Sequence, residues 1–301
     1  MRDTILYGDC RETLGTLKAQ ISIGIAERPR MCVTSPPYYG LRDYGGQDNQ
    51  IGLEQSPEEY VNQLVEVFSG VRDCLADDGT LWVNIGDGYY NYKSGTGEYA
   101  KQSFAKGRQD LPYKNPKRAN KLEGYKDKDL IGAPWMIAFA MRNNGWWLRQ
   151  DIIWSKPNPM PESVRDRCTK SHEYIFLFSK SRNYYFDVDS IKIPTIDGNN
   201  LKRRKSVWEF NTATYKGSHF AVYPPELIKP CIIAGSGEGD IVLDPFMGSG
   251  TTAAVAKSLG RDYIGCELHT DYGKLIQKRV DEYEPVKEVS QEPTINILDI
   301  I

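Results

Sequence analysis

Short runs of apolar residues alternate along the chain with longer segments in which apolar residues recur every three or four positions. The short runs predict buried strands, and the longer segments predict amphipathic helices. The clearest helix covers residues 56–78, where Ser56 and Glu59 form a capping box around Pro57 in the first turn. Strands are expected at residues 4–8, 31–33, 80–87, 146–156, 171–181, 241–243 and 262–267, and further helices after Asp9, at 130–145, at the end of 216–236 and from Thr251. This alternation predicts an α/β fold.

The segment IVLDPFMGSGTTAAVAKSL, residues 241–259, predicts a strand, a glycine-containing turn and a helix. Such a unit directs backbone N–H groups and a helix N-terminus into a crevice at the end of a parallel sheet. Gly248 and Gly250 lack a Cβ, so a ligand can lie against the main chain there. A phosphate-binding P-loop is excluded, because no lysine follows Gly250. A dinucleotide is disfavoured, because Asp244 would repel pyrophosphate, whereas an acid in this turn suits a nucleoside that carries an ammonium group.

Two consecutive prolines leave the strand at 31–33, in the sequence Thr34-Ser35-Pro36-Pro37-Tyr38. Prolines forbid both a helix and ladder pairing, so the chain is fixed as a rigid, extended exit whose carbonyl groups can accept hydrogen bonds from a substrate amino group. Ser35 adds a hydroxyl group, and Tyr38 adds a flat face on which a base could stack. A rigid turn before a loop is the alternative, and the serine, the tyrosine and the glycine turn together favour a substrate site.

Composition limits the class of protein. The chain has 301 residues, 40% of them hydrophobic and 26% charged, with a net charge of −2. These values are typical of a soluble globular protein, and any nucleic-acid surface must come from local segregation of charge. The six cysteines are scattered singly, which indicates reduced thiols and no metal site. No apolar run approaches ~20 residues and the N-terminus is no signal peptide, so we expect a cytoplasmic protein without a membrane segment.

Positive charge gathers in two stretches. Between residues 101 and 128 nine Lys and Arg face three acids, within an inserted loop that we place at 88–129. A solvated surface loop is the alternative to a DNA contact there. A second basic run lies inside 155–217, where we expect the target-recognition elements. The DNA-binding candidates are Lys106, Arg108, Lys114, Lys117, Arg118, Lys202, Arg203, Arg204 and Lys205.

Two further polar positions allow more than one interpretation. Asp87 at the end of the strand 80–87 could be functional or could cap a helix. His172 and Glu173 suggest acid–base chemistry, but no third partner is evident, so His172 is interpreted as a positioning or structural residue.

DPFMGSGTT followed by GCEL, with SPPY earlier in the chain, resembles the β group of DNA amino-methyltransferases. The resemblance spans nearly the whole chain from GDCRETL to GCEL. It implies a Rossmann-like fold that binds S-adenosylmethionine, with a mostly parallel seven-stranded sheet, helices on both faces and a circularly permuted motif order. In that fold the strand bearing Asp244 lies beside the strand bearing Ser35. We therefore expect one methyltransferase domain over 1–301, with 218–283 as its cofactor-binding half.

The resemblance also assigns site residues. It implies that Asp9 lies near the adenine of the cofactor, whereas the sequence alone allows an N-cap equally well. Glu267, at the tip of its strand, is expected to accept hydrogen bonds from ribose hydroxyl groups. The catalytic candidates are Ser35, Pro36, Pro37 and Tyr38. The cofactor-binding candidates are Asp9, Thr34, His219, Phe220, Asp244, Pro245, Phe246, Gly248, Ser249, Gly250, Thr251 and Glu267.

The implied reaction is methyl transfer to the exocyclic amino group of a base flipped out of double-stranded DNA. Ser35 and the Pro36 carbonyl would hold the amino group, without a covalent intermediate. Serine before the prolines favours cytosine N4 over adenine N6. The rivals are an RNA or protein amide methyltransferase and a catalytically silent DNA-binding relative. A cognate restriction endonuclease and a homodimer are further partners that the resemblance suggests for a prokaryotic or phage-encoded enzyme.

Overall fold

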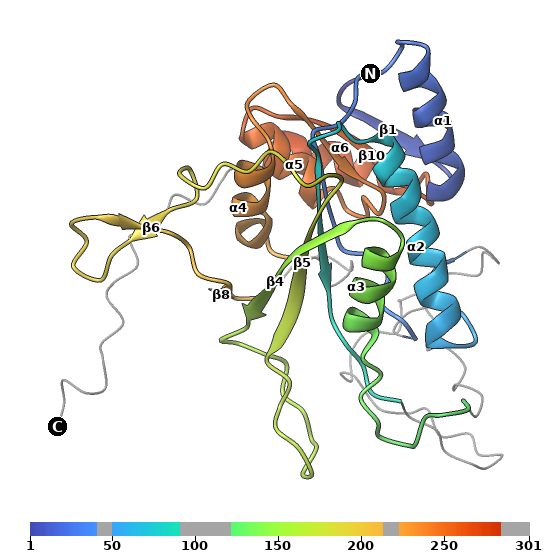
Figure 1. Cartoon of the computed structure of the whole chain (residues 1–301), viewed down its shortest axis with the longest axis vertical. Coiled ribbons are helices and arrows are strands. Elements are labelled where there is room, and N and C mark those ends of the chain that lie inside the picture. Colours follow the sequence, from blue (N-terminus) through green and yellow to red (C-terminus); the bar gives the residue numbers. More distant parts are fainter. Residues whose placement is uncertain (41–49, 91–121, 213–222, 284–301) are drawn as a thin grey trace.

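The computed structural model describes residues 1–40, 50–90, 122–212 and 223–283. Its centre is an eight-stranded sheet flanked by helices (Figure 1). The strands of this sheet are β1 (Thr4–Tyr7), β2 (Met31–Thr34), β3 (Thr80–Ile85), β4 (Trp147–Ser155), β5 (His172–Ser179), β8 (Val207–Glu209), β9 (Ile241–Asp244) and β10 (Asp262–Glu267). The helices are α1 (Cys10–Ser22), α2 (Pro57–Cys74), α3 (Ala133–Asn143), α4 (Pro225–Gly235), α5 (Thr251–Ser258) and α6 (Tyr272–Glu282).

The strands lie in the order β1-β10-β9-β2-β3-β5-β4-β8. Neighbours from β1 to β3 are parallel, and β5 is antiparallel to both β3 and β4. Met31 of β2 pairs with Val242 of β9, so the neighbouring strands expected from the permuted motif order are confirmed. The eighth strand was not expected. It is β8, which pairs with the end of β4 and is only three residues long, too short for a recognisable pattern.

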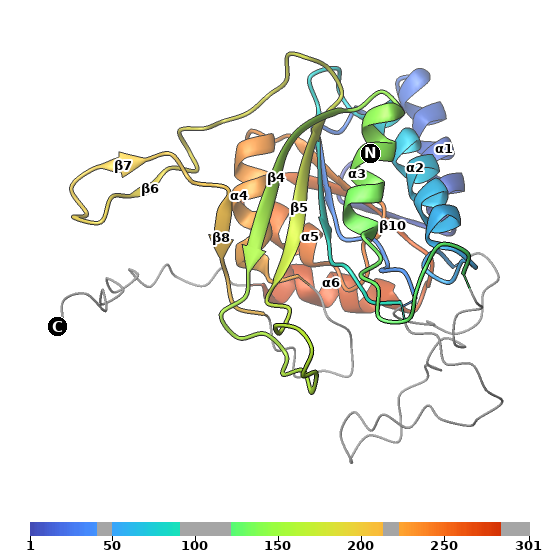
Figure 2. The same ribbon diagram turned by 60° about the horizontal axis from the view of Figure 1, so that its bottom comes forward.

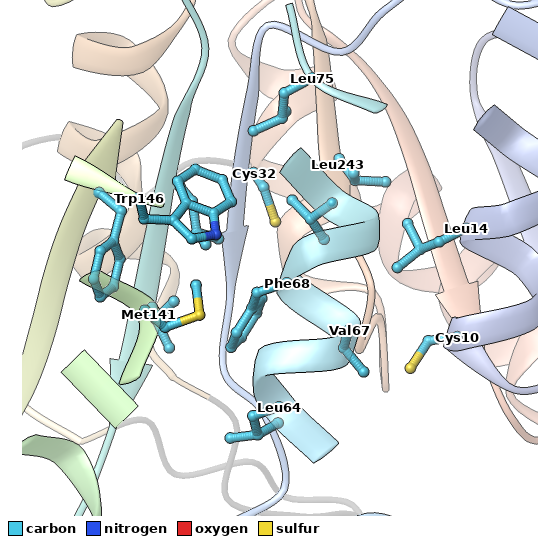
Figure 3. Close-up of a cluster of buried hydrophobic side chains, with 14 of the residues drawn as sticks. Cys10, Leu14, Cys32, Leu64, Val67, Phe68, Leu75, Met141, Trp146 and Leu243 are labelled. Atoms are coloured by element: carbon cyan, nitrogen blue, oxygen red, sulfur yellow. The ribbon is translucent and has the colours of Figure 1, made fainter. Parts of the chain in front are cut away.

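Each face of the sheet has its own hydrophobic core. α1, α2 and α3 cover one face, and α4, α5 and α6 cover the other (Figure 2). Successive residues of a strand point to opposite faces, so Cys32 of β2 joins the first core while Met31 and Val33 join the second. In the first core Phe68 of α2 lies between the sheet and α3, near Met141 (Figure 3). This layered α/β arrangement agrees with the resemblance.

Helix caps explain two of the polar positions. Ser56 Oγ accepts a hydrogen bond from the Glu59 backbone N–H at 3.2 Å, which confirms the predicted start of α2. The Asp87 carboxylate accepts hydrogen bonds from the backbone N–H groups of Gly132 and Ala133, at 3.1 and 3.2 Å. These groups are at the start of α3, so the capping interpretation of Asp87 is confirmed.

The expected target-recognition span 155–217 is not a separate insertion, because β5 lies within it at the centre of the sheet. After β5 the chain leaves the body and forms a small hairpin from β6 (Ile193–Pro194) and β7 (Leu201–Lys202), which projects from the molecule (Figures 1 and 2). Among the described helices none is both long and apolar enough to cross a membrane.

Candidate active site

A cavity of about 300 Å³ lies at the edge of the sheet where β1, β10, β9 and β2 have their carboxyl ends. One side is lined by residues that follow β1, β9 and β10, among them Asp9, Phe246, Gly248 and Glu267. The opposite side is lined by the turn after β2 and by the ends of β3, β4 and β5. The fold thus brings the predicted cofactor turn and the predicted catalytic turn to one cavity.

Glu267 faces the cavity from the end of β10. Its carboxylate accepts hydrogen bonds from the backbone N–H groups of Gly248, at 2.8 Å, and His269, at 3.0 Å. Burial raises the pKa of Glu267 to about 7. The side chain therefore both shapes the glycine turn and offers an acceptor that titrates near neutral pH.

Asp9 takes both of the roles that the sequence left open. Its carboxylate accepts a hydrogen bond from the Arg11 backbone N–H at 2.9 Å and so caps α1, and the residue also lines the cavity. The Arg11 guanidinium, hydrogen-bonded to the carboxylate, lowers the pKa of Asp9. Asp9 therefore stays ionised across the neutral range.

Asp244 lies behind the cavity wall, with 1% of its surface exposed. Thr34 Oγ1 donates to it at 2.6 Å, the Phe246 backbone N–H donates at 2.9 Å, and the hydroxyl groups of Thr252 and Tyr223 complete its partners. Burial raises its pKa, and these hydrogen bonds oppose the rise. The expected contact between Asp244 and an ammonium group has no support in this geometry, and among the described residues neither Asp244 nor Thr34 lines the cavity. Both residues instead hold the turns in place.

The two glycines of the turn have different roles. Gly248 has a φ of +52°, and its backbone N–H is the one that binds Glu267. Gly250 has a φ of +85°, and a Cβ there would lie 2.9 Å from Ile276 Cγ2 of α6. The missing Cβ of Gly250 therefore makes room for a helix and not for a ligand, which corrects the expectation for this position.

Arg279 of α6 reaches under the turn. Its guanidinium donates hydrogen bonds to the hydroxyl groups of Ser249 and Thr251, the latter at 2.7 Å. Because both hydroxyl oxygens accept from Arg279, their hydrogens are available for donation to an acceptor in the cavity, which both residues line. No sequence pattern marked this arginine, since it is one basic residue among several on an amphipathic helix.

The turn after β2 forms the other wall, with Ser35, Pro36, Pro37 and Tyr38 all facing the cavity. The Pro37 carbonyl accepts a hydrogen bond from Tyr60 Oη at 2.7 Å. Within the described residues no hydrogen bond uses the Pro36 carbonyl oxygen. That oxygen can therefore accept a hydrogen bond from a substrate, as the sequence predicted.

A polar cluster beside Tyr38 was missed. Tyr38 Oη donates to Glu173 Oε2 at 2.7 Å, and Glu173 also accepts from Asn84 Nδ2 and Lys156 Nζ. The Lys156 ammonium lies 4.3 Å from the centroid of the Trp154 ring. All of these residues line the cavity. A signal existed for Asn84, an amide in an otherwise apolar strand, whereas Glu173 and Lys156 meet only through the antiparallel pairing of β4 and β5.

Several predicted residues have no place in this cavity. His219, Phe220, Lys106, Arg108, Lys114, Lys117 and Arg118 lie outside the described residues. Lys202, Arg203, Arg204 and Lys205 lie between β6 and β8, and Arg204 packs its guanidinium over the Trp208 ring at 5.5 Å. In the described part of the chain no three His, Cys, Asp or Glu side chains gather in a way that could hold a metal ion.

Residues 30–278 match the family model described as DNA methylase (N6_N4_Mtase). The chain belongs to this DNA methylase family. Type II methyltransferase M.SmaI of Serratia marcescens is 49% identical over 277 residues, which cover 92% of this chain and 90% of that protein. M.Cfr9I of Citrobacter freundii is 48% identical over 256 residues, which cover 83% of this chain and 81% of that protein.

Two solved structures have the same fold as this DNA methylase. The cytosine-N4-specific PvuII DNA methyltransferase superposes with a TM-score of 0.62 at 18% identity, over 95% of this chain and 88% of that one. A DNA modification methylase from Thermus thermophilus, solved with S-adenosyl-L-methionine and titled as putative, superposes with a TM-score of 0.59 at 23% identity, over 92% of both chains.

The protein is thus a DNA amino-methyltransferase with S-adenosylmethionine as its cofactor. The cavity fits that molecule in its donor set. Glu267 and Asp9 offer carboxylate acceptors to hydroxyl and amino groups, and Ser249 and Thr251 offer hydroxyl donors to a carboxylate. The aromatic ring of Phe246 offers an apolar wall.

Proposed function

We propose that this DNA methylase transfers a methyl group from S-adenosylmethionine to N4 of a cytosine in double-stranded DNA. The observation that carries this proposal is the placement of Ser35 and the Pro36 carbonyl on the cavity wall opposite the cofactor turn, on neighbouring strands. Serine at the first position of the motif favours cytosine over adenine. The cytosine-N4-specific PvuII enzyme shares the fold.

Residues after β9 and β10 would hold the cofactor. Glu267 would accept hydrogen bonds from the ribose hydroxyl groups, and Asp9 would lie near the adenine. Ser249 and Thr251, held by Arg279, would donate to the carboxylate of the methionine tail. When bound, S-adenosylmethionine supplies a methyl group on a positively charged sulfur, which keeps the electron pair when that methyl group leaves.

The residues after β2 would prepare the amino group. The lone pair of an exocyclic amino group is delocalised into the ring, so the nitrogen is a poor nucleophile. Hydrogen bonds from its two hydrogens to Ser35 Oγ and the Pro36 carbonyl would make the nitrogen more pyramidal and fix its direction of attack. No covalent intermediate is needed, and the buried Cys32 points into the core below the turn.

The base must leave the duplex to reach Ser35. Tyr38 remains the predicted stacking partner, although its hydroxyl group is tied to Glu173. Lys202, Arg203 and Lys205, and the basic residues of the 88–129 insertion, are proposed to contact DNA phosphates, which predicts binding that weakens steeply with salt. Adenine N6 is the alternative target of the same site.

Product analysis tests the target. The protein is incubated with unmethylated DNA and S-adenosylmethionine, and the nucleosides are analysed by mass spectrometry. We expect N4-methylcytosine. N6-methyladenine would leave the fold and the amino-transfer chemistry standing but reject the choice of base. Methylation of RNA or of a protein amide, with DNA unmodified, would overturn the proposal.

The relatives are named type II methyltransferases. We propose by analogy that a restriction endonuclease of the same site accompanies this protein in the cytoplasm of a prokaryote or in a phage-infected cell, and that the enzyme forms a homodimer. Cleavage of the unmethylated target by extracts of the host, and light scattering of the purified protein, check these two points.

A further inference from the structure

A row of polar side chains leads away from Ser35 along the cavity wall. Tyr38 Oη donates to Glu173 Oε2 at 2.7 Å, and Asn84 Nδ2 donates to the same oxygen at 3.2 Å. The other carboxylate oxygen, Oε1, accepts from Lys156 Nζ. These four residues come from the turn after β2 and from β5, β3 and the end of β4, so the row exists only in the assembled sheet.

The hydrogen bonds in this row have a fixed direction. A phenol has one hydrogen, and Tyr38 gives it to Glu173, so the Tyr38 oxygen can only accept further bonds. Burial raises the pKa of Tyr38 well above its usual value, the Glu173 carboxylate raises it further, and a hydrogen bond with Ser35 lowers it. A hydrogen bond that lowers a phenol pKa is one that the phenol oxygen accepts. Ser35 is therefore the donor to Tyr38.

The Tyr38–Glu173 contact is built into the backbone. A Cβ on Gly86, just after β3, would lie 2.8 Å from Tyr38 Cε2 and 3.2 Å from Glu173 Cδ. The side chains of Glu173 and Lys156 are only 14% and 16% exposed, so the ion pair is largely shielded from water. Lys156 thereby occupies one carboxylate oxygen and leaves the other to Tyr38 and Asn84.

We propose that Glu173 is a positioning residue for methyl transfer, which acts through Tyr38 to turn the lone pairs of Ser35 Oγ toward the target amino group. Because Glu173 takes the Tyr38 hydrogen, Tyr38 takes the Ser35 hydrogen, and Ser35 meets the amino N–H as an acceptor. With the row reversed, the Ser35 hydrogen would face the amino hydrogens and the contact would be repulsive. The inference rests on the proposed function of Ser35.

Glu173→Gln tests the direction of the row with almost no change of shape. Glutamine has one acceptor oxygen and one donor nitrogen, so it cannot accept from both Lys156 and Tyr38. We expect the single-turnover methylation rate to fall about 10-fold or more, with the Kd values for DNA and cofactor within about threefold of wild type. Glu27→Gln on the surface, where the side chain is 63% exposed, is the matched control and should keep the wild-type rate.

The double variant separates this role from a merely structural one. Tyr38→Phe cuts the row, so adding Glu173→Gln to it should cause no further loss of rate. Losses that multiply in the double variant, or a Glu173→Gln variant with the wild-type rate, would overturn the inference while the proposed function stands. If Glu173→Gln does not fold, Tyr38→Phe alone must still show the rate loss at unchanged Kd. A wild-type protein that methylates no amino group removes the proposed function, and this inference with it.

Discussion

Thr34 and Asp244 are 210 residues apart in the chain, yet Thr34 Oγ1 donates a hydrogen bond to Asp244 Oδ1 over 2.6 Å. They are the last residues of the neighbouring strands β2 and β9. One buried carboxylate therefore fixes both the start of the catalytic turn and the start of the cofactor turn. The bond joins the two halves of the active site from behind.

Thr34→Val should remove that bond without changing the volume of the side chain much. Asp244 then loses one donor while it stays buried, and we expect the free energy of unfolding to fall by about 1–3 kcal/mol. Thr34→Ser keeps the hydroxyl group and serves as the control. Urea denaturation of both variants measures the difference, and equal stability of the two would show that the hydroxyl group is dispensable.

Cofactor affinity should depend on pH through Glu267, whose pKa burial raises to about 7. Ribose hydroxyl groups need the ionised carboxylate as their acceptor, and at pH 6 only about a tenth of the side chain is ionised. We therefore expect the Kd for S-adenosylmethionine to fall up to about 10-fold between pH 6 and pH 8, as measured by calorimetry.

The control for this prediction is Glu267→Gln, whose Kd should not change with pH over that range. A variant with the wild-type pH profile would assign the effect to another group. The same raised pKa has a sign for stability. The folded protein binds the extra proton, so this contribution to the free energy of unfolding is present below about pH 4.5 and is lost as the pH rises to about 7.

Gly250→Ala should damage the cofactor turn from the α6 side. The residue has a φ of +85°, and the new Cβ would lie 2.9 Å from Ile276. We expect a loss of about 1–3 kcal/mol in stability and weaker cofactor binding. Gly15→Ala is the opposite case, because Gly15 is exposed within α1 with no atom near its missing Cβ, and it should raise stability by up to about 1 kcal/mol. Thermal unfolding compares the two, and similar effects would contradict this account.

Arg279→Met should weaken cofactor binding about 10-fold, because Ser249 and Thr251 lose the donor that orients their hydroxyl groups. Its neighbour Lys278 is 67% exposed, so Lys278→Met removes the same charge without touching the turn. Calorimetric titration with S-adenosylmethionine distinguishes the variants. Equal affinity in both would mean that the arginine acts only as a surface charge.

The sequence predicted what depends on local pattern. The elements around the sheet, the strand bearing Ser35 and the turn at 244–250 follow from apolar periodicity, caps and glycines, and their adjacency followed from the family resemblance. The sequence could not show which side of a residue faces the ligand. Thr34, Asp244 and Gly250 were assigned to the cofactor, and they instead serve the packing behind it.

Long-range pairing explains the remaining omissions. Glu173 reaches Tyr38 and Lys156 because β5 runs antiparallel between β3 and β4, and no local pattern records that pairing. Arg279 reaches Ser249 only because α6 packs against the turn, in close contact at Gly250. Both residues carry charge on segments that periodicity alone would interpret as surface.

The strand order has a consequence for synthesis of the protein. β1 is made early but pairs only with β10, and β2 has β9 as one of its neighbours. At about 5–20 residues per second the ribosome takes at least ~10 seconds to go from β2 to β9. Over that time the catalytic turn exists without the strand that aligns it. A nascent chain that stops before β9 can thus have every residue of the SPPY turn and still methylate nothing, so the order of the strands acts as a check that the chain has been translated through its cofactor half.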